Sequence, residues 1–474
     1  MNFAETVLGS SPGTVAIIER ARDGARREWT FADLRAEVDL IAARLCGRGL
    51  RPGDVVLTLI GNRPAWAATM LACFRHGFVV LPCNEQLRAK DLQLRLGTVD
   101  VAAVVADPRN REALDAAGVD CPVLWIDELE GPAEPAPAAS TAAPTQPALM
   151  TFTSGTSGPP KCVVHGHRYL WGQEVQARHW MGIRPGDRVW CTAASGWSKS
   201  ARNSFIAPWL RGATAVMHDG RFDVAERLEI AREESVNVLC MAPTEYRTIV
   251  NHGAAAPLAD LRTCVAAGEA LNPEVLRAWG DTTGTVIRDG YGQTETGQLT
   301  AMPVDAPVRP GSMGPPLPGV RAWVDDGELV VDPRTVPTFF LGYHGEESPP
   351  EDEWRTGDRV RQDEDGYLYF EGRADDLIIS AGYRIGPFEV ESVLLEHPAV
   401  GDVGVVAAPD PDRGSIVRAV VVLQEGFEPS PELASRLQDH VKAVTAPYKY
   451  PRQVDFATSL PRTTSGKLRR NAIR

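Results

Sequence analysis

The stretch TFTSGTSGPPK runs from Thr151 to Lys161 and combines hydroxyl side chains, glycines and a single cation. The apolar run ALMTF (148–152) leads into it, which predicts a strand that ends at a loop. Hydroxyls and glycine N–H groups can surround phosphate oxygens, and Lys161 adds a point charge. The order differs from the Walker loop, in which Gly-Lys is followed by Ser or Thr. The stretch therefore predicts a phosphate-binding loop of another kind, although an ordinary Ser/Gly turn fits the residues equally well.

Strand-like and helix-like segments alternate after this loop. VNVLCMA (236–242) follows the polar-faced segment ERLEIAREES (226–235), and further strands are expected at 188–193, 213–218, 261–268 and 285–292, with a helix at 203–210. Apolar strands that alternate with helices predict an α/β fold with a parallel sheet covered on both faces. Ligands bind at the carboxyl ends of such strands. The quoted loop, AAGEAL (266–271) and DGYGQTETG (289–297) all lie at such ends.

The composition changes near residue 330, and a second unit is expected beyond it. Hairpin strands are expected at 353–360 and 365–373, a helix at 388–398, strands at 400–409 and 418–424, and a helix at 431–444. We therefore predict a large N-terminal domain of parallel-rich sheets over residues 1–374 and a small α+β domain over residues 375–474. The Pro/Ala-rich segment 131–147 predicts an extended linker or surface loop.

Composition excludes several classes of protein. The 474 residues carry a formal net charge of −13, whereas a nucleic-acid-binding surface is usually basic, so no nucleic-acid partner is expected. No apolar run is long enough to span a membrane, and MNFAETVLGSSPG lacks the regions of a secretory signal. Eight cysteines without C-x-x-C spacing predict reduced thiols in a cytoplasmic protein.

Five motifs follow one another along the chain: TSGTSGPPK, YGQTETG, TGD, GRADDLIISAGYRIGP and TTSGK. In this order they resemble the adenylate-forming superfamily of acyl-CoA synthetases, luciferases and peptide-synthetase adenylation domains. GRADDLIISAGYRIGPFEVES, LLEHPAV and TAPYKYPR are most similar to the medium-chain acyl-CoA synthetases. The resemblance implies an ATP-dependent ligase that forms an acyl-adenylate and then an acyl-CoA, with ATP, Mg²⁺ and CoA as cofactors. It also implies that the small domain rotates about a hinge at Asp375, and it leaves a homodimer open.

The resemblance assigns the catalytic roles to Lys467, Thr294 and Glu295. A hydroxyl such as that of Thr294 can bond the α-phosphate, and the carboxylate of Glu295 can hold Mg²⁺. Lys467 would bridge the attacking carboxylate and the α-phosphate, and Asp358 in TGD would accept the ribose hydroxyls. Each of these residues alone is as typical of a solvated turn or surface. The residues expected to bind ATP or AMP are Thr153, Ser154, Gly155, Thr156, Ser157, Gly158, Lys161, Gly268, Glu269, Ala270, Asp289, Gly290, Tyr291, Gly292, Gln293, Asp358, Arg373 and Arg384.

The acceptor and acyl sites follow from the same resemblance. The residues expected to bind CoA are Ala381, Gly382, Tyr383, Arg413, Lys442, Tyr450 and Arg452. Trp197 and Gly292 are expected to line the acyl pocket. Acetate-activating relatives carry a tryptophan at the position of Gly292, so glycine predicts room for a medium-chain, branched or aromatic acid. Lys199 and Arg202 raise the weaker alternative of a dicarboxylic acid.

Two other functions stay open at this point. An adenylation enzyme that loads an acyl or amino acid onto a carrier protein would share the motifs. However, amino-acid activators usually place an aspartate in the segment SGWSKSARNS, and none is present there. A non-catalytic adenylate-binding protein is disfavoured because Lys467, Thr294 and Glu295 are all present.

Overall fold

The strand expected before the quoted loop is β7 (Pro147–Phe152), and in the computed structural model it belongs to a mixed sheet. The residues described are 2–129, 135–153, 160–268, 271, 273–373, 376–380, 383–410, 414–463 and 467–473. Within them the strand order is β18 (Gly342–Tyr343), β8 (Cys162–Gly166), β7, β4 (Val79–Cys83), β3 (Val55–Leu59), β5 (Val101–Ala106) and β6 (Val123–Trp125). The strands β7, β4, β3, β5 and β6 are parallel, whereas β8 and β18 are antiparallel to their neighbours.

A second large sheet is formed by later segments together with the first two strands. Its order is β14 (Gly297–Ala301), β13 (Ile287–Gln293), β12 (Thr263–Ala267), β11 (Val238–Met241), β9 (Arg188–Cys191), β10 (Thr214–His218), β1 (Val15–Arg20) and β2 (Arg26–Thr30). All neighbours from β13 to β1 run parallel, and the two edge strands are antiparallel. The predicted α/β class and the strands expected at 188–293 are therefore confirmed.

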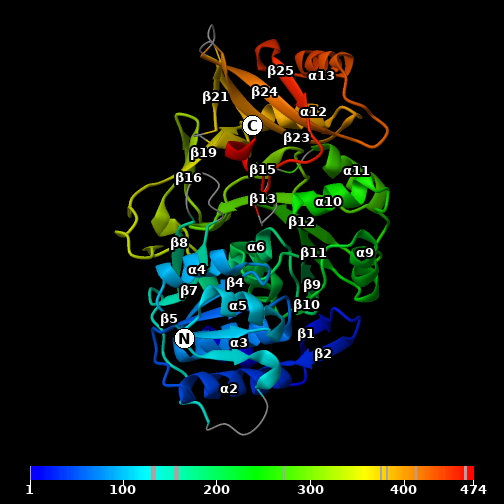
Figure 1. Cartoon of the computed structure of the whole chain (residues 1–474). Helices are drawn as coiled ribbons and strands as arrows, with labels where there is room; N and C mark the ends of the chain where they lie inside the picture. The colour runs from blue at the N-terminus through cyan, green and yellow to red at the C-terminus, as the bar shows by residue number, and fades with distance from the viewer. Residues whose placement is uncertain are drawn as a thin grey trace.

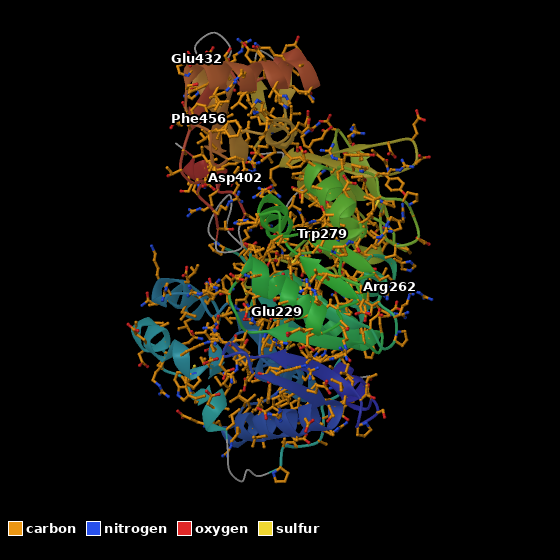
Figure 2. The ribbon with its side chains drawn as sticks, turned by 90° about the vertical axis from the view of Figure 1, so that its right-hand side faces the viewer. Glu229, Arg262, Trp279, Asp402, Glu432 and Phe456 are labelled. Carbon is orange, nitrogen blue, oxygen red and sulfur yellow. The ribbon has the colours of Figure 1, made fainter. Side chains whose placement is uncertain are left out.

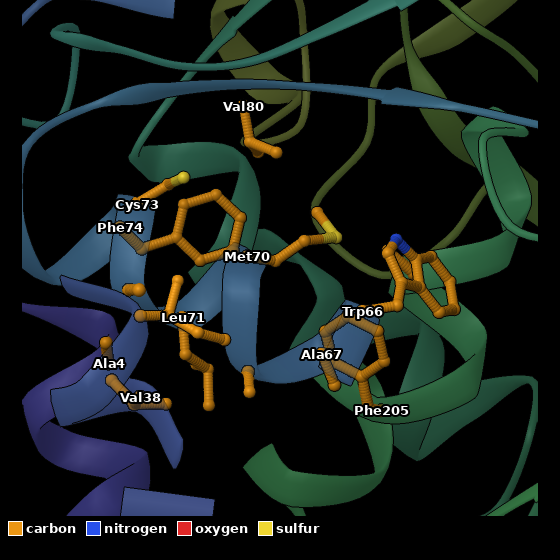
Figure 3. Packing of buried hydrophobic residues seen from close by; sticks show 14 of the residues in the cluster. Ala4, Val38, Trp66, Ala67, Met70, Leu71, Cys73, Phe74, Val80 and Phe205 are labelled. Carbon is orange, nitrogen blue, oxygen red and sulfur yellow. The ribbon is translucent and has the colours of Figure 1, made fainter. Parts of the chain in front are cut away.

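Helices fill the space between the two sheets and cover their outer faces. One hydrophobic cluster contains Ile17 of β1 and Val80 of β4, so it lies between the sheets. Trp66 of α3 packs edge-on against Phe205 at 5.1 Å within this cluster (Figure 3). The helices of this domain are α1 (Phe3–Leu8), α2 (Phe31–Gly47), α3 (Pro64–His76), α4 (Ala89–Thr98), α5 (Arg111–Ala117), α6 (Arg168–His179), α7 (Ser198–Ala201), the π-helical turn η3 (Arg202–Ile206), α8 (Ala207–Leu210), α9 (Val224–Glu233), α10 (Pro243–Asn251) and α11 (Pro273–Thr283).

The helix α3 shows why this core is stable. It begins with a proline at its first turn and ends at Gly77, which adopts φ +75°, a conformation that glycine reaches without steric cost. Nearly every side chain of α3 is buried, including Trp66, Met70, Leu71 and Phe74. Burying such a side chain is worth about 1.5–3 kcal/mol. A helix that is apolar on all sides is expected to lie inside a domain rather than on its surface.

A smaller antiparallel sheet connects the large domain to the rest of the chain. Its order is β15 (Ser312–Gly314), β20 (Leu368–Arg373), β19 (Trp354–Gln362), β17 (Glu328–Val331) and β16 (Ala322–Asp325). β19 and β20 pair antiparallel, which confirms the predicted hairpin at 353–373. The 3₁₀ turns of the chain are η1 (Pro108–Asn110), η2 (Ile126–Glu128), η4 (Pro333–Thr335), η5 (Pro447–Lys449) and η6 (Arg470–Ala472).

The small α+β unit lies at one end of the molecule (Figure 1). Its elements are β21 (Ile378–Ser380), β22 (Tyr383–Ile385), α12 (Pro387–Leu395), β23 (Val400–Asp410), β24 (Gly414–Leu423), α13 (Pro431–Val444) and β25 (Gln453–Phe456). Its own core contains Val390, Leu394, Val405, Leu433 and Leu437, so a separate unit is present as expected. The segment after β25 runs back toward the large domain (Figure 1). The expected hinge, Asp375, lies outside the described residues.

All eight cysteines are free thiols, as the spacing predicted. Among the described residues, no helix has the length and apolar character needed to cross a membrane.

Candidate active site

The segment DGYGQTETG forms a hairpin rather than an open loop. β13 ends at Gln293, the turn holds Thr294–Thr296, and β14 begins at Gly297. The register shifts between Tyr291 and Gly292, and an ideal Cβ on Gly292 would lie 1.8 Å from the carbonyl oxygen of Gly297. This backbone therefore has no room for a side chain at Gly292, and a larger residue requires the hairpin to move.

Thr294 and Glu295 sit at the tip of this hairpin, where other elements hold them. The backbone carbonyl of Thr294 lies 2.8 Å from Nε2 of His165 on β8. Burial lowers the pKa of His165 to about 3, so its ring is neutral and donates this bond. Tyr343 Oη donates to Oε1 of Glu295 at 2.8 Å. Burial and the neighbouring carboxylate raise the pKa of Tyr343, so it remains a donor.

The base of the quoted loop is fixed to the same corner. Thr153 and Lys161 bond each other twice, from Thr153 N to Lys161 O at 2.9 Å and from Lys161 N to Thr153 Oγ1 at 3.0 Å. The Lys161 ammonium lies 4.3 Å from the ring centre of Tyr343 and 3.2 Å from Glu346. Lys161, Tyr343 and Glu295 thus connect the loop to the hairpin. The expected phosphate-binding residues Ser154, Gly155, Thr156, Ser157 and Gly158 lie outside the described residues.

Asp358 on β19 is the centre of a polar network. Its Oδ2 accepts hydrogen bonds from Tyr291 Oη at 2.5 Å and Gln293 Nε2 at 2.8 Å, and its Oδ1 lies 3.3 Å from Arg373 Nη1. Burial raises the pKa of Asp358, while the charges of Arg373 and Lys467 oppose that rise. Lys467, the lysine expected to be catalytic, thus favours the ionised form of this carboxylate through its charge. Tyr291, Gln293 and Arg373 therefore surround the carboxylate of Asp358.

Asp289, the expected adenine contact, is a buried acid next to this hairpin. Its side chain is 8% exposed and accepts a hydrogen bond from Gly290 N at 2.8 Å. Burial raises its pKa to about 8. The neighbouring Gly268 adopts φ +99°, and Lys199 Nζ caps the end of β12 by donating to Ala267 O at 3.0 Å. Glu269 and Ala270 lie outside the described residues, as do all details of the Arg384 side chain.

The segment that carries Trp197 is tethered to the other large sheet. Ser195 Oγ donates to Ile60 O at 2.5 Å, and Asn62 Nδ2 donates to Ala193 O at 3.2 Å. Gly196 adopts φ +86° and its ideal Cβ would lie 2.2 Å from Asn84 N, which only glycine permits. These contacts place half-buried Trp197 between the ends of the two sheets, where an acyl group would be expected.

Three of the residues expected to bind CoA form one surface cluster. The ammonium of Lys442 and the guanidinium of Arg452 lie 4.5 and 4.9 Å from the ring centre of Tyr450. Tyr383 stacks on Tyr448, with the ring centres 4.3 Å apart. Ala381, Gly382 and Arg413 lie outside the described residues.

Some residues of the site escaped sequence reasoning. Tyr343 lies in none of the quoted motifs, whereas Tyr448 lies in TAPYKYPR but was not among the residues expected to bind CoA. Among the described residues, no group of three His, Cys, Asp or Glu side chains is suited to a metal ion. Glu295 fits Mg²⁺ as a single carboxylate ligand, since Mg²⁺ in nucleotide sites usually takes one or two carboxylates plus phosphate oxygens.

Comparisons with known proteins match this architecture. The model of the AMP-binding enzyme family matches residues 4–339, and that of the AMP-binding enzyme C-terminal domain matches residues 389–467. The chain is 39% identical to the uncharacterized acyl-CoA ligase YtcI of Bacillus subtilis (strain 168), covering 97% of this chain and 92% of the relative. It is 35% identical to the mitochondrial acyl-coenzyme A synthetase ACSM3 of Mus musculus, covering 95% and 85%. The crystal structure of the anthranilate CoA ligase AuaEII with anthranoyl-AMP superimposes with a TM-score of 0.92 at 26% identity, covering 100% of this chain and 96% of that one.

Proposed function

The chain belongs to the AMP-binding enzyme family, as an acid–thiol ligase of the acyl-CoA synthetase class, and from this premise we propose the roles of its residues and its substrate. Enzymes of this class use ATP, Mg²⁺ and CoA. The observation that carries the proposal is the network in which Asp358 accepts hydrogen bonds from Tyr291 and Gln293 and pairs with Arg373, beside the hairpin that bears Thr294 and Glu295.

In the first step, a carboxylate oxygen of the acid attacks the α-phosphorus of ATP. The P–O bond to pyrophosphate breaks, its electron pair leaves with pyrophosphate, and acyl-AMP forms. Both reactants are anionic, so Lys467 would bridge them and Thr294 would donate to the α-phosphoryl group, an arrangement worth a few kcal/mol per donor. Glu295 would hold Mg²⁺, which neutralises phosphate charge. Residues 153–161 would hold the departing pyrophosphate, and Asp289, Asp358 and Arg373 the nucleoside.

In the second step, the thiol sulfur of CoA attacks the acyl carbonyl carbon. The C–O bond to AMP breaks, AMP leaves with its electron pair, and the thiol proton passes to solvent. Rotation of the small domain about Asp375 would withdraw Lys467 and present Tyr383 to the pantetheine chain. Lys442, Tyr450 and Arg452 suit the phosphates and base of CoA, because their charges and ring share one surface.

We propose that the acid is larger than acetate, namely a medium-chain, branched or aromatic acid. Glycine at position 292, where acetate-activating relatives carry a tryptophan, supports this size, and Trp197 would supply an apolar wall. Each buried methylene would add about 0.8 kcal/mol to binding. The alternative role of Lys199 as a contact for a second carboxylate is weakened by its hydrogen bond to the carbonyl of Ala267.

A pyrophosphate-release screen tests this function. Acids from acetate to dodecanoate, with branched and aromatic acids, are supplied with ATP, Mg²⁺ and CoA, and AMP and acyl-CoA are measured alongside. We expect AMP release that requires both an acid and CoA. Release only when a carrier protein replaces CoA would instead indicate a carrier-loading enzyme. A cytoplasmic location and a homodimer remain predictions, to be checked by cell fractionation and by light scattering.

A further inference from the structure

Ion pairs and packing hold both flanks of Lys467 on the small domain. Arg462 lies before Lys467, and its Nη2 is 2.5 Å from Oδ2 of Asp402 on β23. Arg470 lies after Lys467, and its Nη2 is 2.6 Å from Oε2 of Glu391 on α12. Between them, Arg462 and Leu468 form an isolated antiparallel bridge, and Thr463 N donates to Lys467 O at 2.8 Å. We call the described parts of this segment, 462–463 and 467–470, the lysine hairpin.

The packing surface of the lysine hairpin lies next to Asp402. An ideal Cβ on Gly404 of β23 would lie 2.5 Å from Ile473 Cδ1 and 3.1 Å from Leu468 Cδ2. Apolar side chains of the C-terminal segment therefore rest directly on the backbone of β23, two residues beyond Asp402. This close contact holds the lysine hairpin against β23, and the Arg462–Asp402 ion pair holds the start of the hairpin in place.

Asp402 also contacts the large domain. Its Oδ1 lies 3.8 Å from Nη2 of Arg247 on α10, and the two side chains are 22% and 21% exposed. Figure 2 shows Asp402 on the side of the small domain that faces the large one, above the region of Trp279. One carboxylate thus joins the base of the lysine hairpin to a helix of the other domain.

We propose that Asp402 is a positioning residue for Lys467 in the adenylation step. It holds the lysine hairpin through Arg462 and sets the orientation of the small domain through Arg247. This inference rests on the proposed function. Small displacements of a reacting group cost large factors in rate, and Lys467 reaches the nucleotide site only while the domains keep this orientation. Asp402 and Arg462 belong to the same domain, so a rotation of that domain keeps the Arg462–Asp402 pair. The same rotation breaks the Arg247–Asp402 pair.

The two half-reactions therefore depend differently on the Arg247–Asp402 pair. Adenylation takes place in the orientation that the pair stabilises. Thiol transfer from preformed acyl-AMP takes place after the Arg247–Asp402 pair has broken. Loss of Arg247 should slow the first step and leave the second unchanged or faster, whereas general damage to the fold would slow both.

The test measures the two steps separately with hexanoate, and with benzoate as a second acid. Acid-dependent ATP–pyrophosphate exchange reports the first step, and CoA thioester formation from supplied hexanoyl-AMP reports the second. The variants are Arg247→Ala, Arg247→Lys and Asp402→Asn. The matched control is Arg111→Ala, since Arg111 forms an exposed ion pair with Glu128 on α5 and η2, with both partners on the large domain.

We expect Arg247→Ala to slow exchange about two- to five-fold, the range of a partly exposed ion pair. Arg247→Lys should restore most of the exchange rate. Asp402→Asn should slow exchange about ten-fold, because both ion pairs of Asp402 are lost. Higher salt should slow exchange more in the wild type than in Arg247→Ala, because exposed pairs are screened. Arg111→Ala should change neither step.

Unchanged exchange in Arg247→Ala would overturn the inference, and so would equal losses in both half-reactions. If Asp402→Asn fails to fold, Arg247→Ala decides the question alone, because it leaves the small domain intact. A wild type that shows no exchange with any acid of the panel would overturn the proposed function itself. A third outcome would overturn only the role of Asp402. In that outcome the wild type shows normal exchange, Lys467→Ala abolishes it, and Arg247→Ala leaves it unchanged.

Discussion

Replacing Asp289 by Asn should stabilise the protein, and increasingly so as the pH rises. The carboxyl group is almost fully buried, and its pKa is raised from 3.8 to about 8 by burial. The backbone N–H of Gly290 offsets only part of this cost by bonding Oδ1. Asparagine has nearly the same shape and keeps an acceptor for Gly290, but it has no charge to desolvate.

The sign and size follow from proton linkage. Below about pH 4 the carboxyl is protonated in both the folded and the unfolded chain, so it contributes nothing to pH dependence. Between about pH 4 and pH 8 the unfolded chain loses the proton and the folded chain keeps it, so stability falls by about 1.4 kcal/mol per pH unit. The accumulated cost is about 4 kcal/mol at pH 7 and levels off above about pH 8.

Urea unfolding, followed by tryptophan fluorescence, measures this effect at a series of pH values. The free energy of unfolding of Asp289→Asn minus that of the wild type should grow by about 4 kcal/mol between about pH 5 and pH 8. Asp115, exposed on α5, provides the matched control, and Asp115→Asn should differ from the wild type by the same amount at every pH. A difference for Asp289→Asn that stays constant or shrinks with pH would refute the assigned burial of a protonated acid.

Three further changes test the site. Lys467→Ala should reduce acid-dependent pyrophosphate exchange at least about 100-fold, as for loss of a transition-state donor, and spare thiol transfer from supplied acyl-AMP; retained exchange would contradict the mechanism. Gly292→Ala should reduce exchange more than about ten-fold, because its Cβ would meet the Gly297 carbonyl and displace the hairpin; Gly280→Ala, with open space around its Cβ, should leave exchange unchanged. Tyr343→Phe should raise the Mg²⁺ concentration for half-maximal exchange about two- to ten-fold, since Glu295 loses its orienting donor. An unchanged Mg²⁺ dependence would show that Glu295 does not bind the metal.

The change at Gly292 also alters how the acyl preference should be probed. A tryptophan there is expected to close the pocket in acetate-activating relatives. In this chain the register shift beside Tyr291 directs any side chain at this position into the facing strand. Gly292→Trp would therefore disturb Thr294 and Glu295 before it shortened the pocket. Trp197 lies outside that hairpin in the sequence, so if it lines the acyl pocket as proposed, Trp197→Ala should report chain-length preference more directly.

The sequence predicted the elements well where local pattern determines them. The apolar runs before the quoted loop and around 236–242 became β7 and β11, and the polar-faced segment at 226–235 became α9. It did not predict that two parallel sheets enclose α3, because uniform apolar character shows that a helix is buried without showing what covers it. The contact of Tyr343 with Glu295 joins residues 48 positions apart, and no periodicity within either segment records such a pairing.

The position of Lys467 links nucleotide binding to the arrangement of the domains. Burial disfavours the ionised form of Asp358, and the charges of Arg373 and Lys467 favour it. Arg373 belongs to the same sheet as Asp358, so its contribution is permanent, whereas that of Lys467 depends on where the small domain lies. An ionised Asp358 accepts ribose hydroxyls more strongly than a protonated one. In the proposed mechanism the presence of Lys467 would therefore strengthen the hold of Asp358 on the nucleotide while the α-phosphate reacts, and its departure would weaken that hold. Loss of Lys467 should accordingly weaken ATP binding slightly as well as slow adenylation. ATP titration of Lys467→Ala by calorimetry measures the effect on binding, and acid-dependent pyrophosphate exchange measures the effect on the rate.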